Sequence, residues 1–375
     1  MAMWGLTVVF IIFGYRPPPR HARLDGLSIW QKIQRLDLPG MGMLTAGLTL
    51  LLTGLSLGQA PWPWSSGRVV ATLVAGCVIL VAFGVYEWKG TKIGILHHDL
   101  FSMGRTFAIC IGLIFIEGIM LFTIIVFYPA LTINLFETNP FLVAARGIPF
   151  WICAGCSTVL YGFASSKFRT IRSPLLIGFV LFTTGMVGLA TVQPGQSTRT
   201  IVFDGLAGLG FGAPFILVIA GVQLSTPHHL IATATAVVTS SRAVAASTFT
   251  AIYGAALSTR LDAKIPAYIA KAALAAGLPP SSLPAFVSAI ATKDVAALPT
   301  IPGVTPPIIA AAIAAVSQAL ADGFRIIFII AAPFGLVAIV ACYFLGDLSK
   351  TMHYRVDAPM EEIHAKHHHE TAEAA

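Results

Sequence analysis

Long uncharged apolar runs dominate this chain and restrict it to the membrane. The run from Gly205 to Ser241 holds no Asp, Glu, Lys or Arg over 37 residues, whereas one helix needs only about 20 apolar residues to cross a bilayer. Only 10% of all residues are charged, against about 25% in soluble domains. The runs do not alternate polar and apolar residues, which excludes a lipid-facing β-barrel. The sequence therefore predicts an all-α, polytopic helical membrane protein.

Eight stretches are long enough to be full transmembrane helices, and a ninth run at 1–14 is interpreted as a partial one. The full helices are predicted at 38–58, 69–86, 106–128, 147–166, 174–193, 201–224, 231–257 and 324–346. Seven regions follow from them: the partial helix 1–14, a cytosolic basic linker 15–37, two linker helices 38–86, a cytosolic loop 87–105, a six-helix bundle 106–257 with 324–346, an extracellular, partly helical Ala/Pro-rich loop 258–323, and a cytosolic tail 347–375.

The distribution of basic residues fixes the expected orientation. Segments 15–37, 87–105, 167–173 and the C-terminal tail hold fourteen Lys and Arg, whereas 59–68, 129–145 and 194–200 hold two. Cytosolic loops carry the excess of positive charge, so the first group and the C-terminus are expected in the cytosol. The net charge of +7 is thus accounted for by membrane topology, and no nucleic-acid partner is expected.

Two charged residues lie in the middle of predicted membrane helices. A charge there costs about 2.5–3.5 kcal/mol on insertion scales, so each is a functional candidate. Glu117 is a candidate proton carrier, because a carboxylate in low dielectric takes up a proton more readily. Its alternative role is a structural ion pair with Arg242 or Arg146. Arg242 keeps its charge and is a candidate substrate anchor, partner of Glu117, or structural link between helices.

Other polar residues lie at the ends of predicted helices. Arg146, Asp204, Asp322 and Arg325 are further substrate or ion-pair candidates, with a structural or solvated role as the alternative. Gly208 and Gly212 have the small-xxx-small spacing that lets membrane helices pack closely. No catalytic residue set, cofactor site or metal site is predicted; His364 and His367 to His369 lack the fixed geometry that a metal requires.

Several short stretches, spread over nearly the whole chain, resemble the major facilitator superfamily. Within it, the chain is similar to the fungal 14-span drug:proton antiporters, and most of all to the trichothecene efflux pump family. The stretches that carry this resemblance are Gly14 to Arg20 with Arg35 to Asp37, Leu48 to Trp64, Arg105 to Gly118, Gly208 to Gly212, Ile231 to Thr235 with Arg242, Ala321 to Arg325, and Gly346-Asp347.

The resemblance implies a function and a site. It implies proton-coupled efflux of small amphipathic compounds, a toxin or drug, by alternating access at the plasma membrane, with the bilayer, protons and the substrate as partners. Lys167, Arg169 and Arg172 resemble a degenerate copy of the basic cytosolic turn that helps to gate such proteins, with an ordinary positively charged cytosolic turn as the alternative. The chain corresponds to spans nine to fourteen and two linker spans, so a missing N-terminal half is expected as a further partner. Two alternatives remain: a siderophore or other solute porter of the same fold, and a non-transporting fragment or accessory subunit.

Overall fold

A computed structural model describes most of the chain, and every element in the described part is helical. The described residues are 2–14, 28, 30, 37–58, 62–91, 94–95, 100–101, 104–227, 230–292, 294, 298–346, 348–349 and 352. The predicted all-α fold is confirmed. Most of the basic linker 15–37, including all of its Lys and Arg residues, lies outside the described residues, as do the histidines of the tail and most of the predicted tail 347–375.

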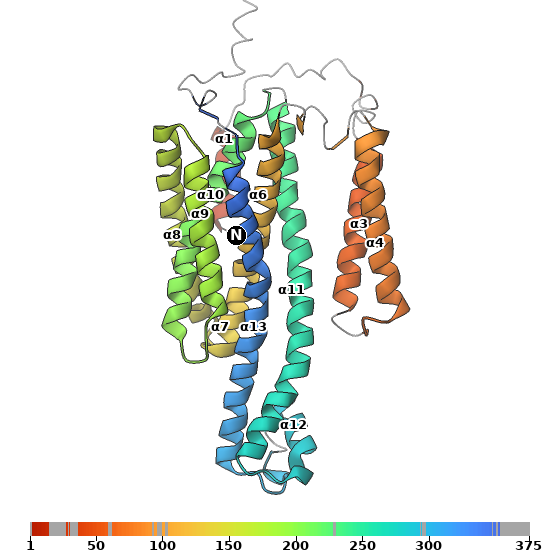
Figure 1. The fold of residues 1–375 in the computed structure, drawn as a ribbon, viewed down its shortest axis with the longest axis vertical. Coiled ribbons are helices and arrows are strands. Elements are labelled where there is room, and N and C mark those ends of the chain that lie inside the picture. The colour runs from red at the N-terminus through yellow and green to blue at the C-terminus, as the bar shows by residue number, and fades with distance from the viewer. Residues whose placement is uncertain are drawn as a thin grey trace, which may run out of the picture.

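Six long helical segments form one bundle (Figure 1). They share one hydrophobic core, which includes Leu113, Phe182, Phe211, Tyr253 and Phe328. The segments are α6 (Arg105–Phe122) with η2 (Thr123–Phe127) and α7 (Tyr128–Leu135), α8 (Pro140–Phe168), α9 (Arg172–Ala190), α10 (Ser197–Leu224), α11 (Ile231–Ala275) and α13 (Pro306–Tyr343).

The remaining helices lie outside this core. The helices α3 (Leu38–Leu57) and α4 (Gly67–Val85), followed by the π-helical turn η1 (Tyr86–Gly90), form an antiparallel hairpin, and α3 approaches α11 (Figure 1). Asp37 caps α3, accepting a hydrogen bond from the Gly40 N–H at 3.0 Å. The short helix α1 (Ala2–Gly14) exposes every side chain from Met3 onward.

The first bundle segment is continuous but irregular. The π-helical turn η2 separates α6 from α7, and Pro129 follows it in the first turn of α7. Proline has no N–H to donate to the residue four positions earlier. A wider π turn accommodates that lost bond without ending the helix, so Arg105–Leu135 remains one membrane-length segment of 31 residues.

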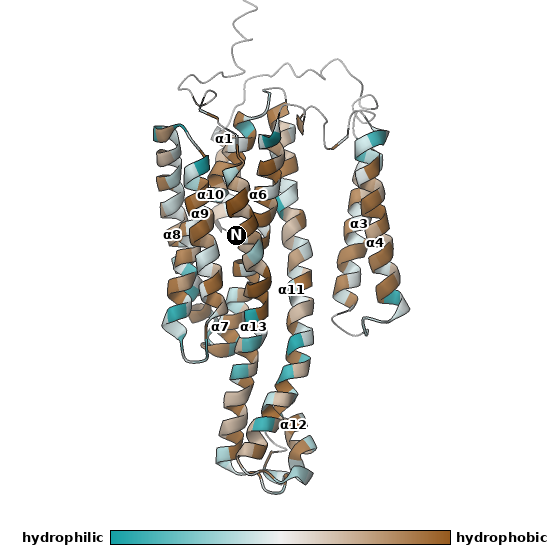
Figure 2. Ribbon diagram, in the orientation of Figure 1, coloured by the Kyte–Doolittle hydropathy of each residue, from teal (hydrophilic) through white to brown (hydrophobic). Residues whose placement is uncertain are grey.

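Seven of the described helices are long and apolar enough to cross a membrane: Leu38–Leu57, Gly67–Gly90, Arg105–Leu135, Pro140–Phe168, Arg172–Ala190, Ser197–Leu224 and Pro306–Tyr343. Figure 2 shows hydrophobic colour along the bundle and a paler α11. Helix α11 is not among the seven, because Ser, Thr and Arg242 lower its hydropathy. It nevertheless packs against α6 and α13, and its assignment as the span 231–257 stays a prediction.

The segment 258–323, expected as a partly helical loop, is largely helical in its described part. Helix α11 continues to Ala275 and α13 begins at Pro306, so the two run side by side beyond the bundle (Figure 1). The turn η4 (Pro280–Ser282), α12 (Leu283–Ala291) and the turn η5 (Leu298–Thr300) close the extension. Its prolines occupy mostly turns and first helical turns, where no N–H is required, while the alanine-rich stretches favour helix.

A second small core stabilises this extension. Buried residues from α11, α12, α13, the turn η5 and the segment after α11 contact each other there, separate from the core of the bundle: Ile269, Ala273, Leu278, Phe286, Ala289, Leu298, Ile308 and Ala312. This contiguous cluster gives the extension a hydrophobic interior of its own.

Candidate functional site

Glu117 and Arg242 form a buried ion pair between α6 and α11. The Nε of Arg242 donates to Oε2 of Glu117 at 2.7 Å, which is the short distance of a charge-assisted hydrogen bond. The Glu117 side chain is fully buried, and the Arg242 side chain is 18% exposed. Of the two partners that the sequence offered Glu117, the structure selects Arg242.

Gly118 makes this pair sterically feasible. A Cβ on Gly118 would lie 2.8 Å from the carbonyl oxygen of Arg242 and 3.2 Å from its Cα. Only glycine therefore permits α6 and α11 to approach this closely beside the two charges. The sequence placed Gly118 next to Glu117 but gave no sign of which helix it contacts.

Both charged groups of the pair keep unused hydrogen-bonding capacity. Oε1 of Glu117 and Nη2 of Arg242 are buried without a partner among the residues that the structure describes. The guanidinium also lies 5.6 Å from the centre of the Phe215 ring, a cation–π distance. Buried polar atoms without a hydrogen-bond partner are destabilising. A further proton on Glu117, or a polar group bound at Arg242, would therefore be favourable at this pair.

A hollow lies on the same two helices as the pair, and Ala243, the residue after Arg242, is part of its wall. Its volume is about 830 Å³, and it lies between α3, the α6–η2 segment and α11. Its wall is mostly apolar, with Phe122 and Ala243 among the lining residues, and it carries the hydroxyl groups of Ser56, Ser247 and Thr250. Apolar walls with a few polar groups are typical of small-molecule sites.

Arg146 lies away from the pair. It donates to the Ser197 hydroxyl at the start of α10, and its guanidinium lies 6.0 Å from the Phe136 ring centre. Its carbonyl oxygen accepts a hydrogen bond from the Tyr128 hydroxyl at 3.2 Å. Arg146 thus links α8, α10 and α7 rather than joining Glu117.

Asp204 lies deeper along α10 and is fully buried. Neither of its carboxyl oxygens has a hydrogen-bond partner within the described part of the chain. The structure therefore gives Asp204 no ion pair, in contrast to Glu117.

Asp322 and Arg325 form a separate cluster where the extension leaves the bundle. Oδ2 of Asp322 accepts from the Tyr268 hydroxyl at 2.5 Å and lies 3.7 Å from Nζ of Lys264, while Oδ1 lies 3.5 Å from Arg325. The Nε of Arg325 also donates to the carbonyl of Ala190, at the C-terminal end of α9, at 2.9 Å. A cation is stabilised at this position because the C-terminal end of a helix carries a partial negative charge.

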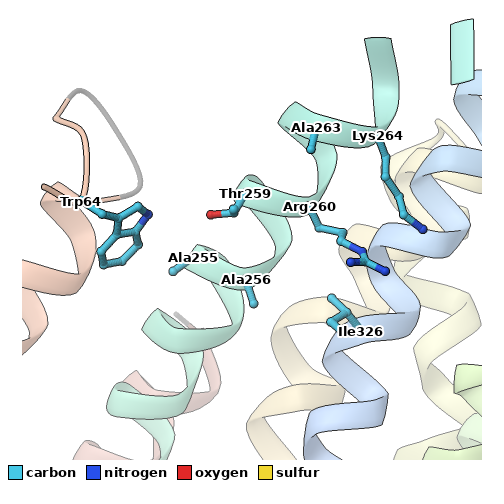
Figure 3. Close-up of a pocket in the computed structure, with 8 residues that line it drawn as sticks. All are labelled: Trp64, Ala255, Ala256, Thr259, Arg260, Ala263, Lys264 and Ile326. Atoms are coloured by element: carbon cyan, nitrogen blue, oxygen red, sulfur yellow. The ribbon is translucent and has the colours of Figure 1, made fainter. Parts of the chain in front are cut away.

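Figure 3 shows the hollow beside this cluster, where Arg260 and Lys264 reach from α11 toward α13. The hollow has a volume of about 530 Å³ and includes Trp64, from the turn before α4, and Ile326 of α13. Tyr268 and Lys264 were missed as site residues because the predicted helix ended at 257, whereas α11 continues to Ala275. Their spacing with Arg260, at i, i+4 and i+8, was the available signal, since such residues share a helix face.

The basic turn between α8 and α9 makes local contacts. The Lys167 ammonium lies 5.9 Å from the Phe163 ring centre, and the Arg172 guanidinium lies 4.5 Å from that of Tyr343 on α13. Arg169 ends α8 in the left-handed conformation, at φ 49°. These contacts connect the turn to α13, the last helix of the bundle.

Gly208 and Gly212 face α8. A Cβ on Gly208 would lie 2.2 Å from the Phe150 carbonyl oxygen, and one on Gly212 would lie 2.6 Å from the Thr158 nitrogen. The close approach allows Thr158 to donate across the interface to the Gly212 carbonyl at 3.3 Å. Gly210 faces the other way, against Phe182 of α9, so α10 is packed tightly on two sides.

No cluster of three His, Cys, Asp or Glu side chains suited to a metal occurs within the described ranges. His97, His98, His228 and His229 lie outside them.

Comparison with known proteins identifies relatives. The sequence model of the family described as fungal trichothecene efflux pump (TRI12) matches residues 1–371. The chain is 26% identical over 360 residues to the trichothecene efflux pump TRI12 of Fusarium sporotrichioides, covering 92% of this chain and 59% of that protein. It is 26% identical over 382 residues to the pump of that name from Trichoderma arundinaceum, covering 96% and 61%.

Two further similarities lie outside these pumps. The Acurin A biosynthesis cluster MFS-type transporter of Aspergillus aculeatus is 30% identical over 247 residues, which are 65% of this chain and 44% of that protein. Among solved structures, an inward-facing bacterial homologue of the human lysosomal transporter Spinster superposes with a TM-score of 0.45 and 16% identity, over 80% of this chain and 64% of that chain.

The chain spans about 60% of the length of the two trichothecene pumps. The family match confirms the resemblance inferred from the short motifs, and the membrane-length helices agree with an integral membrane protein. This chain belongs to the fungal trichothecene efflux pump family, whose members are MFS-type membrane transporters and not enzymes.

Proposed function

We propose that this chain takes part in proton-coupled efflux of small amphipathic compounds by alternating access. The observation that supports this proposal most directly is the buried Glu117–Arg242 pair, with one unpartnered atom on each side chain. The names of two of its relatives suggest trichothecene toxins as the first compounds to test.

Protonation of Glu117 would convert the pair into a neutral acid beside an unpaired cation. A hydrogen bond to a charged group stabilises by about 1.5–3 kcal/mol. One pH unit supplies about 1.4 kcal/mol per proton, and about 100 mV of membrane potential adds roughly 2.3 kcal/mol. The proton gradient is therefore large enough to offset the loss of this bond and to release α6 from α11.

The released Arg242 would bind a polar group of the substrate. Ala243, the residue that follows Arg242, lines the hollow of about 830 Å³. A compound with an apolar body and one oxygen-rich edge matches this wall, with the edge at Arg242 and the body against Phe122. Loss of the proton would restore the pair and expel the compound.

The proposed setting is the plasma membrane with the C-terminus in the cytosol. The bundle 106–257 with 324–346 would supply one side of the transport path, and 38–86 the two linker helices. The turn with Lys167, Arg169 and Arg172 would then lie at the cytosolic face, where its contact with α13 would take part in gating. The extension within 258–323 would project outside the cell.

Transport by the full chain in proteoliposomes tests this function. A pH gradient is imposed, and uptake of a tritiated trichothecene into the vesicles is measured. Glu117→Gln is expected to abolish gradient-driven uptake, because glutamine keeps the shape and loses the titratable proton. Glu137→Gln is the matched control, since Glu137 lies in the turn between α7 and α8, where its side chain caps backbone N–H groups.

Each outcome has a defined meaning. Uptake by the unchanged protein and by Glu137→Gln, with none by Glu117→Gln, supports the proposal. Equal gradient-driven uptake by Glu117→Gln would refute the role of Glu117. Absence of uptake by the unchanged protein would refute transport by this chain alone.

A further inference from the structure

Asp204 is a second buried carboxyl group, and the transport cycle proposed above does not use it. It is fully buried in α10, and both oxygens lack a hydrogen-bond partner among the described residues. An ionised carboxylate needs a cation or several donors when it is removed from water. Glu117 has such a partner in Arg242, and Asp204 has none.

The side chains that face Asp204 carry no permanent charge. From α7, Tyr128 interacts with it electrostatically, and its hydroxyl already donates to the Arg146 carbonyl at 3.2 Å. From α8, Cys153 interacts with it electrostatically, and the backbone N–H of Phe150 is directed at its carboxyl group in a weak contact that falls short of full hydrogen-bond geometry. On the α9 side, the neighbouring turn of α10 packs so closely that a Cβ on Gly185 would lie 2.6 Å from the Ala207 nitrogen.

The cation on the adjoining part of α8 is held away from Asp204. Arg146 donates to the Ser197 hydroxyl, and Ser197 precedes Asp204 by seven residues on the same helix. Seven residues rise about 10 Å along an α-helix. The guanidinium is thus anchored about two turns from the carboxyl group and does not pair with it.

We propose that Asp204 is a second proton-binding site, occupied by a proton in the packed arrangement of α7, α8 and α10. A neutral carboxyl group avoids the desolvation penalty that an unpaired carboxylate would carry here. Under this proposal the two carboxyl groups differ in state: Glu117 is ionised and paired with Arg242, and Asp204 is neutral and unpaired.

The surrounding backbone offers a way to release this proton. Pro149 lies inside α8, and a Cβ on Gly205 would lie 3.8 Å from its Cβ. Proline removes one intrahelical hydrogen bond and favours bending. Bending of α8 at Pro149 would admit water to Asp204, which would then ionise; this part of the inference rests on the proposed function.

Infrared difference spectroscopy of the full chain tests the proton on Asp204. Protonated carboxyl and carboxylate groups absorb in separate regions, and the protonated band shifts in D₂O. The spectrum of the unchanged protein minus that of Asp204→Asn, at neutral pH, is expected to contain one protonated-carboxyl band. Glu117→Gln is the matched control and should lose a carboxylate band instead. Loss of a carboxylate band in Asp204→Asn would overturn the proposal.

Two further measurements keep the result decisive if Asp204→Asn does not fold. A hydrophobic carbodiimide, which reacts with protonated carboxyl groups, should modify Asp204 at least tenfold more than Glu117 in the unchanged protein, by peptide mass mapping; preference for Glu117, or no adduct on Asp204, counts against the proposal. Adding Na⁺ at constant pH should leave the protonated-carboxyl band of the unchanged protein as it is. Loss of this band on adding Na⁺ would indicate that Asp204 binds a metal cation instead.

These readouts separate the inference from the proposed function. If the protonated-carboxyl band of Asp204 is present but neither the unchanged protein nor any variant transports, the proton site stands and the transport proposal fails. If transport depends on Glu117 but Asp204 is ionised, the transport proposal stands and the second proton site is refuted.

Discussion

Replacing Gly118 by alanine should force α6 and α11 apart beside the Glu117–Arg242 pair. The added Cβ would lie 2.8 Å from the Arg242 carbonyl oxygen, whereas ordinary van der Waals contact begins at 3.4 Å. The helices must therefore separate locally by about 0.6 Å, the difference between these distances. If that shift reaches the pair, the Nε–Oε2 distance of 2.7 Å becomes about 3.3 Å, beyond the range of about 2.7–2.9 Å for such bonds.

The expected destabilisation follows from overpacking. Inserting a methyl group into a packed interface typically costs about 1–3 kcal/mol. Gly112→Ala is the matched control, because it lies on the same helix and its added Cβ meets nothing within 4 Å. Both variants gain the same helix propensity, about 1 kcal/mol, so this gain cancels in the comparison. Gly118→Ala should be less stable than Gly112→Ala by about 1–3 kcal/mol.

Thermal unfolding followed by a thiol-reactive dye measures this difference. Cys110 and Cys342 are buried and react only as the bundle opens. Gly118→Ala should melt several degrees below Gly112→Ala and should lose gradient-driven uptake as Glu117→Gln does. Equal melting temperatures of the two variants, together with unchanged uptake by Gly118→Ala, would refute the close-contact reasoning.

Three other predictions follow from local geometry. Arg169→Gly should be more stable than Arg169→Ala by about 1 kcal/mol in thermal unfolding, because φ is 49° there and a side chain in the left-handed region costs about 1–2 kcal/mol; equal stability would argue against the strain. Gly208→Ala should melt below Gly155→Ala, since its Cβ would lie 2.2 Å from a backbone oxygen of α8 while that of Gly155 meets nothing within 4 Å; the reverse order would contradict this packing. The hydrogen bond that Tyr268 donates to the Asp322 carboxylate raises the pKa of Tyr268. Deprotonation of Tyr268 would break this bond. Its contribution to stability is therefore complete below the unfolded pKa of about 10 and is lost as pH rises through the higher folded value. Tyr268→Phe should lower the melting temperature at neutral pH and reduce the alkaline dependence; an unchanged alkaline profile would be contrary evidence.

Composition and periodicity predicted most of the fold. Runs of apolar residues long enough to cross a bilayer predicted the helices, because backbone groups in lipid must be satisfied within the segment. The extension was predicted less well. The residues of 258–323 suggested a partly helical loop, but a single sequence does not show that Pro284 and Pro306 lie in the first turns of helices or that a second core around Phe286 stabilises them.

The candidate site, like the fold, was predicted from the sequence only in part. The sequence alone identified Glu117, Arg242, Arg146 and Asp204, since a charge among apolar residues is visible in one dimension and is costly wherever it falls in the bilayer. Only the tertiary structure decided their partners. Glu117 and Arg242 are 125 positions apart and meet because Gly118 lets two helices touch, while Arg146 is held at Ser197 and Asp204 has no partner among the described residues. Pairing depends on helix rotation and separation to within about 1 Å, and these are set by side chains on several helices together.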